Sequence, residues 1–376
     1  MTRVYLDHNA TAPLRPEARA AMIAAMDVVG NPSSVHGEGR AAKALVERAR
    51  AQVAALVGCE PGDVIFTSGA TEAASLAIPE FATVSSAGIE HDAVLSWVQK
   101  DGVDLTHLLD VDADGVLTGT AQGASFEEKI WDDVVALQAA NSETGVLQDT
   151  MPHAQALWAL KRQVLVLVDA VQALGKIPFS FANSGADFVL ASAHKLGGPK
   201  GVGALIVKHG IDVKARIRGG GQEMGRRSGT ENVIGIAGFG AAAAAAAADV
   251  ASGRWQDVKK LRKILENTLA AEAKTTIFVG KDAKRLPNTS CFATPGWKGE
   301  SQVIQMDLAG FAVSAGSACS SGKVRASTVL RAMGYDEETA SSAIRVSLGL
   351  ETTEQDVLRF AEAWLAQERK FRARAA

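Results

Sequence analysis

Cysteine is rare in this chain, and charge of one sign is nowhere concentrated. The 376 residues include 3 cysteines, Cys59, Cys291 and Cys319, whose odd number and spacing argue against a disulfide framework or a metal site and favour a reducing, cytoplasmic setting. The net charge is -3, with no long run of one sign. This balance argues against nucleic acid or an anionic membrane surface as the main partner and favours a small-molecule substrate.

Targeting and membrane signals are also missing. The N-terminus has no apolar stretch of the secretory kind. Residues 233–248 are wholly apolar, but they are mostly Ala and Gly and fall short of the ~20 strongly hydrophobic residues that span a bilayer. We expect a tightly packed interior or interface helix there. The length of the chain predicts one large domain and a smaller one.

Short apolar runs alternate with helical patterns along most of the chain. The predicted strands are residues 64–67, 134–140, 164–168, 188–190 and 204–207; the predicted helices include 37–57, 151–162, 233–248 and 255–273. Helices are also expected from Pro16 to near Gly30 and at 300–308, 327–333 and 353–372, with a strand near 288–293. This alternation indicates an α/β fold with a parallel or mixed sheet covered on both faces.

Two side chains follow predicted strands directly. Asp169 comes after 164–168, and Lys195 comes after 188–190 and before a glycine-rich turn. Ligands of such sheets bind at the carboxyl ends of the strands. A lysine there can form an imine with an aldehyde, and a carboxylate can keep a pyridine nitrogen protonated. A solvated loop lysine is the competing interpretation of Lys195 taken alone.

A third feature is the turn from strand 64–67 into a helix, Ser68-Gly69-Ala70-Thr71-Glu72. The free N–H groups and positive dipole at a helix N-terminus favour a phosphate there. Ser68 or Thr71 acting only as a helix cap explains the same residues without a ligand. Together, the lysine, the carboxylate and the turn are what a pyridoxal phosphate cofactor requires.

Several motifs in order resemble cysteine desulfurases of the NifS/IscS type, in the class V aminotransferase family of pyridoxal-phosphate enzymes. They are Tyr5-Leu6-Asp7, Gly30-Asn31-Pro32-Ser33-Ser34, the 66–72 turn, Glu90-His91, Val168-Asp169-Ala170-Val171-Gln172, His194-Lys195, Arg227-Ser228-Gly229-Thr230, Ser317-Ala318-Cys319 and Ile344-Arg345-Val346-Ser347. The resemblance implies fold type I, with a seven-stranded, mostly parallel sheet in a large domain (16–252). A smaller α+β domain (253–376, with the arm 1–15) would carry the cysteine loop.

The resemblance also implies roles for single residues. Lys195 would bind the cofactor aldehyde, His91 would stack on the ring and move protons, and Cys319 would accept the substrate sulfur. The cofactor contacts would come from Ala70, Thr71, Ser142, Asp169, Gln172, Ser192 and His194, and from Thr230 of the other subunit of a homodimer. Arg345 and Asn9 would bind the substrate, and no metal is implied.

Two positions depart from the family pattern. Ser142 stands where the family usually has Asn, with Asn141 one place earlier, and Ser75 replaces a common Asn after the phosphate turn. We expect these changes to tune cofactor affinity and to leave the chemistry in place. Cys59 and Cys291 are expected to pack structurally.

The predicted function is conversion of L-cysteine to L-alanine, with the sulfur held as a persulfide on Cys319 for an acceptor such as an iron-sulfur scaffold. A selenocysteine lyase or another class V aminotransferase is the first alternative, since neither strictly requires Cys319. A catalytically silent assembly subunit is the second, and the intact Lys195, Asp169 and His91 argue against it.

Overall fold

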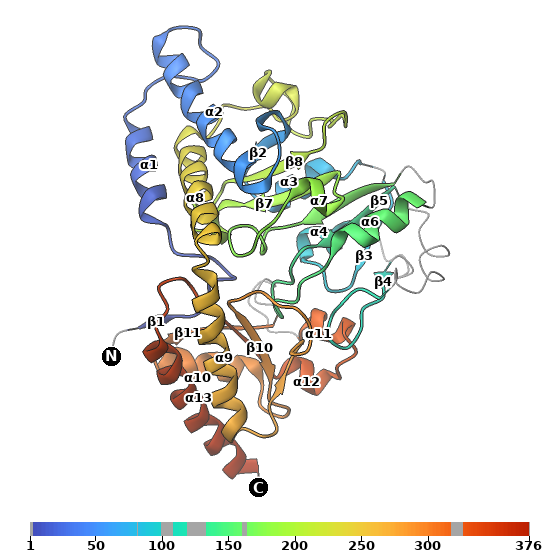
Figure 1. Ribbon diagram of the computed structural model, residues 1–376, viewed down its shortest axis with the longest axis vertical. Helices are drawn as coiled ribbons and strands as arrows, with labels where there is room; N and C mark the ends of the chain where they lie inside the picture. The colour runs from blue at the N-terminus through green and yellow to red at the C-terminus, as the bar shows by residue number, and fades with distance from the viewer. Residues whose placement is uncertain are drawn as a thin grey trace.

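The computed structural model describes residues 3–80, 82–98, 108–118, 133–159, 164–316 and 326–375, and the chain forms two lobes joined by the long helices α8 and α9 (Figure 1). Cys319 lies outside the described residues, so its predicted role receives no structural account.

The upper lobe is built on a seven-stranded sheet in the order β2-β8-β7-β6-β5-β3-β4. Strands β7, β6, β5, β3 and β4 run parallel to one another, and β8 is antiparallel to both β2 and β7. The strands are β2 Val64–Thr67, β3 Val84–Ala87, β4 Leu108–Leu109, β5 Val134–Gln138, β6 Leu165–Asp169, β7 Phe188–Ser192 and β8 Gly203–Val207. The predicted mixed, mostly parallel sheet of fold type I is confirmed.

Helices cover both faces of this sheet. They are α1 Pro16–Met26, α2 Gly37–Val57, α3 Ala70–Ala77, α4 Asp92–Val98, α6 Thr150–Ala159, α7 Phe181–Ser184 and α8 Val233–Ala251, with short 3-10 turns η1 Pro61–Asp63, η3 Ala193–Lys195 and η4 Gln222–Gly225. One apolar cluster packs the sheet against α2 and α8, and a second packs its other face against α3. The prediction of a sheet buried on both sides is therefore correct.

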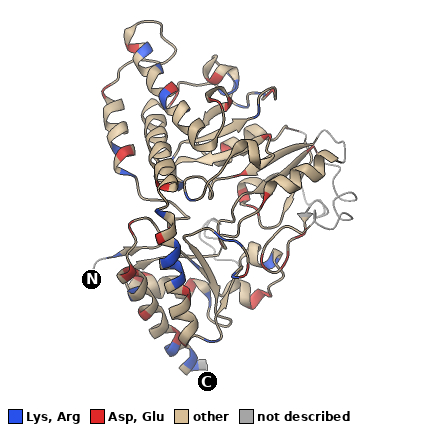
Figure 2. Ribbon diagram, in the orientation of Figure 1, with Lys and Arg blue, Asp and Glu red and all other residues tan. Residues whose placement is uncertain are grey.

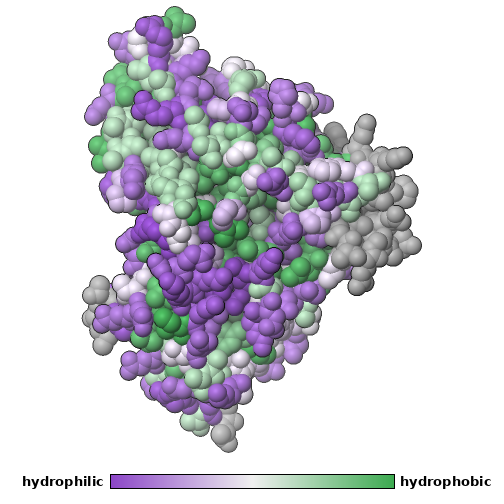
Figure 3. Space-filling model, in the orientation of Figure 1, coloured by the Kyte–Doolittle hydropathy of each residue, from purple (hydrophilic) through white to green (hydrophobic). Residues whose placement is uncertain are grey.

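The apolar helix α8 packs against α1 and α2. The contact is close because α8 carries glycine: a Cβ built on Gly240 would lie 2.5 Å from the Cα of Ala49 in α2. Among the described helices, α8 alone is long and apolar enough to cross a membrane by length and composition, and 56% of its apolar window is buried. Figure 3 shows a mainly apolar surface over α8 and a hydrophilic one over α9 below it.

The lower lobe contains a four-stranded sheet in the order β12-β13-β10-β9 and the parallel pair β1-β11. Its elements are β1 Val4–Tyr5, α9 Trp255–Glu272, β9 Ile277–Phe278, β10 Thr289–Ala293, α10 Gly299–Leu308, β11 Phe311–Ala312, β12 Ser314–Ala315, α11 Thr328–Ala332, α12 Glu337–Ser341, β13 Ala343–Ser347 and α13 Glu354–Ala375. Because β1 pairs with β11, the N-terminal arm belongs spatially to this lobe. The division at residue 252 stays a prediction.

Charged residues of both signs are spread over the outer helices, while the central strands carry few (Figure 2). One predicted boundary was too long: α1 ends at Met26 and not near Gly30. Val28 and Val29 are β-branched and Pro32 follows, and both features disfavour helix there.

Candidate functional site

The two predicted strand-end residues lie on neighbouring parallel strands. Asp169 is the last residue of β6, and Lys195 ends the 3-10 turn η3 that follows β7. One carboxylate oxygen of Asp169 accepts a hydrogen bond from the Val171 backbone N–H at 2.9 Å. Burial raises the pKa of Asp169, while that bond and the positive fields of His91 and Lys195 lower it. The lysine and the carboxylate therefore share one end of the sheet.

The amine of Lys195 faces the N-terminal arm. Its Nζ donates to the backbone carbonyls of Asn9 at 2.7 Å and Ala10 at 3.0 Å. His194, beside it, has Nδ1 3.2 Å from the Thr11 hydroxyl, and burial lowers its pKa to about 4, helped by the positive charge of nearby lysines. A neutral His194 can offer a neutral N–H to a phosphate.

Asn9 is the centre of a buried network in this arm. Its side-chain amide donates to the Ser142 carbonyl at 3.1 Å and to the Thr289 hydroxyl at 2.9 Å, and its own exposure is 0%. Gln172 donates to the Asn9 backbone carbonyl at 2.9 Å. These contacts fix the position of Asn9 beside Ser142 and Gln172. Its predicted contact with substrate stays a prediction.

Lys176 is a second buried amine in the same network, one that the sequence analysis did not single out. Its Nζ donates to the side-chain oxygen of Gln172 at 2.6 Å and lies 3.4 Å from that of Asn9. Burial lowers the pKa of Lys176 well below its usual value, and the positive fields of Lys195 and Arg345 lower it further. The spacing Gln172-Ala173-Leu174-Gly175-Lys176 was the available signal, because side chains four apart meet on a helical turn.

The segment predicted to bind phosphate is a turn from strand β2 into helix α3, and phosphate binding there stays a prediction. Helix α3 begins at Ala70 after Gly69, and Gly69 provides no side-chain cap. The turn passes close over β8: a Cβ on Gly203 would lie 2.6 Å from the Gly69 Cα. Ser68 lies one residue before this N-cap position, and its backbone N–H donates to Glu72 at 2.8 Å. The first amides of α3 are thus not used by a cap from this turn.

Other predicted cofactor residues lie around this turn and the sheet end. Ser192 is the buried last residue of β7, next in the chain to η3. Thr230 is exposed on its own chain, and the nearby Arg227 pairs with Glu72 of α3 at 2.9 Å. An exposed Thr230 is compatible with a contact to a second subunit, which stays a prediction.

His91 precedes α4, after the carboxyl end of β3. Its Nδ1 accepts the Ala93 backbone N–H at 3.1 Å, and its positive field acts on both Asp169 and Glu143. Beside it, Ser142 contributes its backbone carbonyl to the site. The preceding Asn141 is buried and bonded within its own turn and to the Ile89 carbonyl at 2.9 Å. The side-chain amide of Asn141 is therefore already engaged by these contacts.

Arg345, the predicted carboxylate-binding residue, lies on β13 and reaches the same place. One guanidinium nitrogen donates to Asp7 at 2.7 Å and the other to the Ser142 carbonyl at 3.0 Å. Its Nε is buried with no hydrogen-bond partner among the described residues. Asp7 also accepts a hydrogen bond from Ser314 of β12 at 2.8 Å. Asp7 and the Ser142 carbonyl thus occupy the two terminal nitrogens of Arg345, and its predicted contact with a substrate carboxylate stays a prediction.

The two ends of the segment that carries Cys319 lie close together beside Arg345. Ser314 of β12 pairs with Arg345 of β13, and the chain leaves the described residues after Gly316. A Cβ on Gly316 would lie 3.0 Å from the Cβ of Ser327, where the segment has returned. Ser327 caps α11 and donates its hydroxyl to Glu143 at 2.5 Å.

The other two cysteines are unsuited to thiolate chemistry. Burial raises the pKa of Cys59 to about 12 and raises that of the fully buried Cys291 further still. Within the described residues, no group of three His, Cys, Asp or Glu side chains is placed to hold a metal ion.

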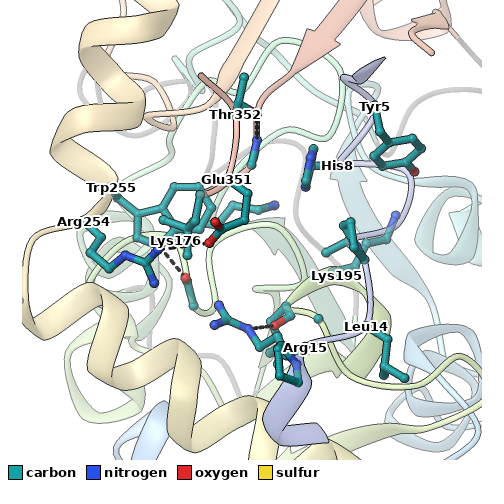
Figure 4. A pocket seen from close by; sticks show the side chains of 18 of the residues that line it. Tyr5, His8, Leu14, Arg15, Lys176, Lys195, Arg254, Trp255, Glu351 and Thr352 are labelled. Atoms are coloured by element: carbon teal, nitrogen blue, oxygen red, sulfur yellow. Dashed lines mark hydrogen bonds and ion pairs between the residues drawn. The ribbon is translucent and has the colours of Figure 1, made fainter. Parts of the chain in front are cut away.

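A cavity of about 590 Å³ lies between the N-terminal arm and the start of α9 (Figure 4). Lys195, Lys176 and His8 line it, but Asp169, His91 and Arg345 do not. The three arginines that line it are already paired: Arg3 with Asp307, Arg15 with Asp249, and Arg254 with Asp249 and Glu351. The cavity therefore includes Lys195 but is separate from the part of the site formed by Asp169, His91 and Arg345.

The residues present fit pyridoxal phosphate. The uncapped start of α3 suits a phosphate, Asp169 suits a protonated ring nitrogen, and Lys195 suits the aldehyde. Fold and site together define a pyridoxal-phosphate enzyme of the class V aminotransferase type. The sequence profile of the family described as aminotransferase class-V matches residues 4–360, and the chain belongs to this family.

More particular relatives point the same way. The chain is 40% identical over 375 residues to a cysteine desulfurase of Cereibacter sphaeroides, covering 96% of this chain and 95% of that one. It is 38% identical over 369 residues to a cysteine desulfurase of Enterobacter agglomerans, covering 95% and 90%. A solved NifS-like protein from Rickettsia africae has a TM-score of 0.88 and 33% identity, covering 97% and 99%.

Proposed function

We propose that this chain is a cysteine desulfurase that converts L-cysteine to L-alanine and holds the released sulfur as a persulfide on Cys319. The observation that carries the proposal is that Lys195 and Asp169 share one end of the sheet, and that the Cys319 segment leaves from a strand paired with Arg345. The full-length similarity to cysteine desulfurases of other organisms supports it.

When bound, pyridoxal phosphate supplies an electron sink for charge released at the substrate α carbon. Asp169 would hold the proton on the ring nitrogen. Lys195 would bind the aldehyde and, once displaced by the substrate amine, move a proton away from the α carbon. Arg345 would bind the substrate carboxylate through its planar fork, which requires it to exchange Asp7 for the substrate.

Cys319 would perform the sulfur transfer. Its thiolate attacks the substrate sulfur, so that an S–S bond forms and the substrate C–S bond breaks with its electron pair remaining on the carbon skeleton. That carbon then takes a proton, and alanine leaves. His91 is suited to deliver protons, because an imidazole can both take and release them near neutral pH.

The assembly and setting are part of the same proposal. We infer a cytoplasmic homodimer in which Thr230, exposed on its own chain, contacts the phosphate of the partner's cofactor. A sulfur-acceptor protein, such as an iron-sulfur scaffold, would then receive the persulfide sulfur. Size-exclusion chromatography with multi-angle light scattering of the purified protein tests the dimer.

The reaction itself is tested by giving the purified, cofactor-loaded protein L-cysteine and a reductant, and by measuring alanine and sulfide. We expect equal amounts of both, and Cys319→Ala should stay yellow yet release no sulfide. Cys59→Ser is the matched control and should keep its turnover. Consumption of a keto acid, or sulfide release by Cys319→Ala, would contradict the proposal and favour a transaminase or a lyase.

A further inference from the structure

Glu90 is a buried acid beside the candidate site to which the mechanism above gives no task. It follows β3, is 3% exposed, and neither carboxylate oxygen has a hydrogen-bond partner among the described residues. A buried carboxylate without hydrogen bonds is strongly disfavoured, whereas the neutral acid costs far less. Such a group in a native structure calls for an explanation.

The sheet places Glu90 near Asp169. Strand β5 lies between β3 and β6, and Gln138 at its end is in register with Asp169. The side chain of Gln138 donates back to the carbonyl of Ile89 at 3.2 Å, which ties the turn before Glu90 to this strand end. Three adjacent strand ends therefore present Glu90, Gln138 and Asp169 in a row.

The two acids differ in what supports a negative charge. Asp169 accepts the Val171 N–H and lies in the positive fields of His91 and Lys195. Burial first, and then the negative charge of Asp169, raise the pKa of Glu90. The backbone N–H of Gln138 lies near enough to lower that pKa in part, but it does not reach hydrogen-bond geometry with either oxygen of Glu90. Among the described residues, Asp169 is the charged group whose field acts on Glu90. A proton shared by the pair therefore belongs on Glu90.

We propose that Glu90 is a positioning residue that holds a proton behind Asp169, so that Asp169 alone carries the negative charge that faces the cofactor ring nitrogen. This proposal rests on the proposed function at one point: it takes Asp169 to be the residue that faces the cofactor ring nitrogen. An ionised Glu90 would compete with Asp169, because two adjacent carboxylates cannot both stay charged at low cost.

The test uses the apoprotein, so that its outcome is independent of desulfurase activity. The folded state holds a proton on Glu90 that the unfolded state loses above a pKa of about 4.3, so the contribution of Glu90 to stability falls as pH rises above that value. Each such proton changes the unfolding equilibrium constant by up to about tenfold per pH unit. In Glu90→Gln this contribution is absent, so its stability should fall less steeply with pH than that of the wild type, as measured by urea unfolding.

Glu362→Gln, at an exposed glutamate, is the matched control and should keep the wild-type slope. Infrared difference spectra of folded wild type minus Glu90→Gln at neutral pH should show the C=O stretch of a protonated carboxyl, which a merely structural role would not require. If Glu90→Gln fails to fold, the same band is sought in the wild type alone by pH titration. An unchanged slope, or absence of the band, would overturn the proposal.

Discussion

Replacement of Glu223 by Gln should cost about 3–5 kcal/mol of folding free energy, because it removes the buried ion-pair partner of Arg50 and leaves that charge with only the half-exposed Glu47. The carboxylate of Glu223 accepts hydrogen bonds from both terminal guanidinium nitrogens of Arg50, at 2.7 and 2.8 Å. The side chain of Glu223 is 2% exposed and that of Arg50 is 5% exposed. Glu223 also accepts the Phe66 backbone N–H at 3.0 Å and has a φ of 49°, a backbone conformation that a glutamate seldom adopts.

The same pair positions the phosphate turn. Arg50 donates to the Val64 carbonyl at 2.8 Å, and Glu223 accepts the Phe66 N–H, so the pair is bonded to the backbone of β2 at two residues. Ser68 follows β2 directly. We therefore expect Glu223→Gln to bind pyridoxal phosphate more weakly as well as to unfold at lower urea. The loss is a large fraction of the ~5–15 kcal/mol that stabilises a typical protein.

Two controls decide whether the buried charge is the cause. Glu272→Gln removes an exposed ion pair with Arg369 and should cost less than about 1 kcal/mol. Replacement of both Arg50 and Glu223 by Met should cost less than Glu223→Gln alone, because no buried charge is then left unpaired. If Glu223→Gln loses no more stability than Glu272→Gln in urea unfolding, the reasoning is refuted.

Further predictions concern the cysteine segment and the arm. Ser327→Ala removes the cap of α11 and the partner of Glu143, and should cost about 1–3 kcal/mol in urea unfolding; a loss within error would contradict this. Burial lowers the pKa of His8 to about 4, so between about pH 4 and 6.5 the unfolded chain binds more protons and stability rises with pH. His8→Gln should flatten that rise, and an unchanged slope would exclude His8 as its source.

Much of the sheet could be predicted because its strands are buried on both faces and read as continuous apolar runs. Residues 64–67 form β2 as predicted, and the runs near 165, 188 and 204 form β6, β7 and β8 with shifts of one or two residues. Strands β3 and β4 were not predicted. β3, Val-Ser-Ser-Ala, contains two serines and β4 has two residues, so neither carries a recognisable apolar run.

The site was predictable in its strand-end residues and not in its supporting network. Asp169 and Lys195 follow recognisable strands, so their positions follow from topology. The pairing of Asp7 with Arg345 could not be predicted from spacing, because the two residues are 338 positions apart and meet only when the N-terminal arm packs against β13. The spacing of Gln172 and Lys176 was visible in the sequence, but the burial of the Lys176 amine beside Asn9 depends on the same packing. Such contacts are set by tertiary packing, which local patterns do not encode.

The central claim is that Cys319 carries the sulfur, and mass spectrometry tests it most directly. The cofactor-loaded protein is given L-cysteine without reductant, digested and analysed peptide by peptide. We predict one extra sulfur atom on the peptide that contains Cys319 and none on those with Cys59 or Cys291, whose thiols are held protonated by burial. Formation of alanine with no extra sulfur on the Cys319 peptide would contradict the account.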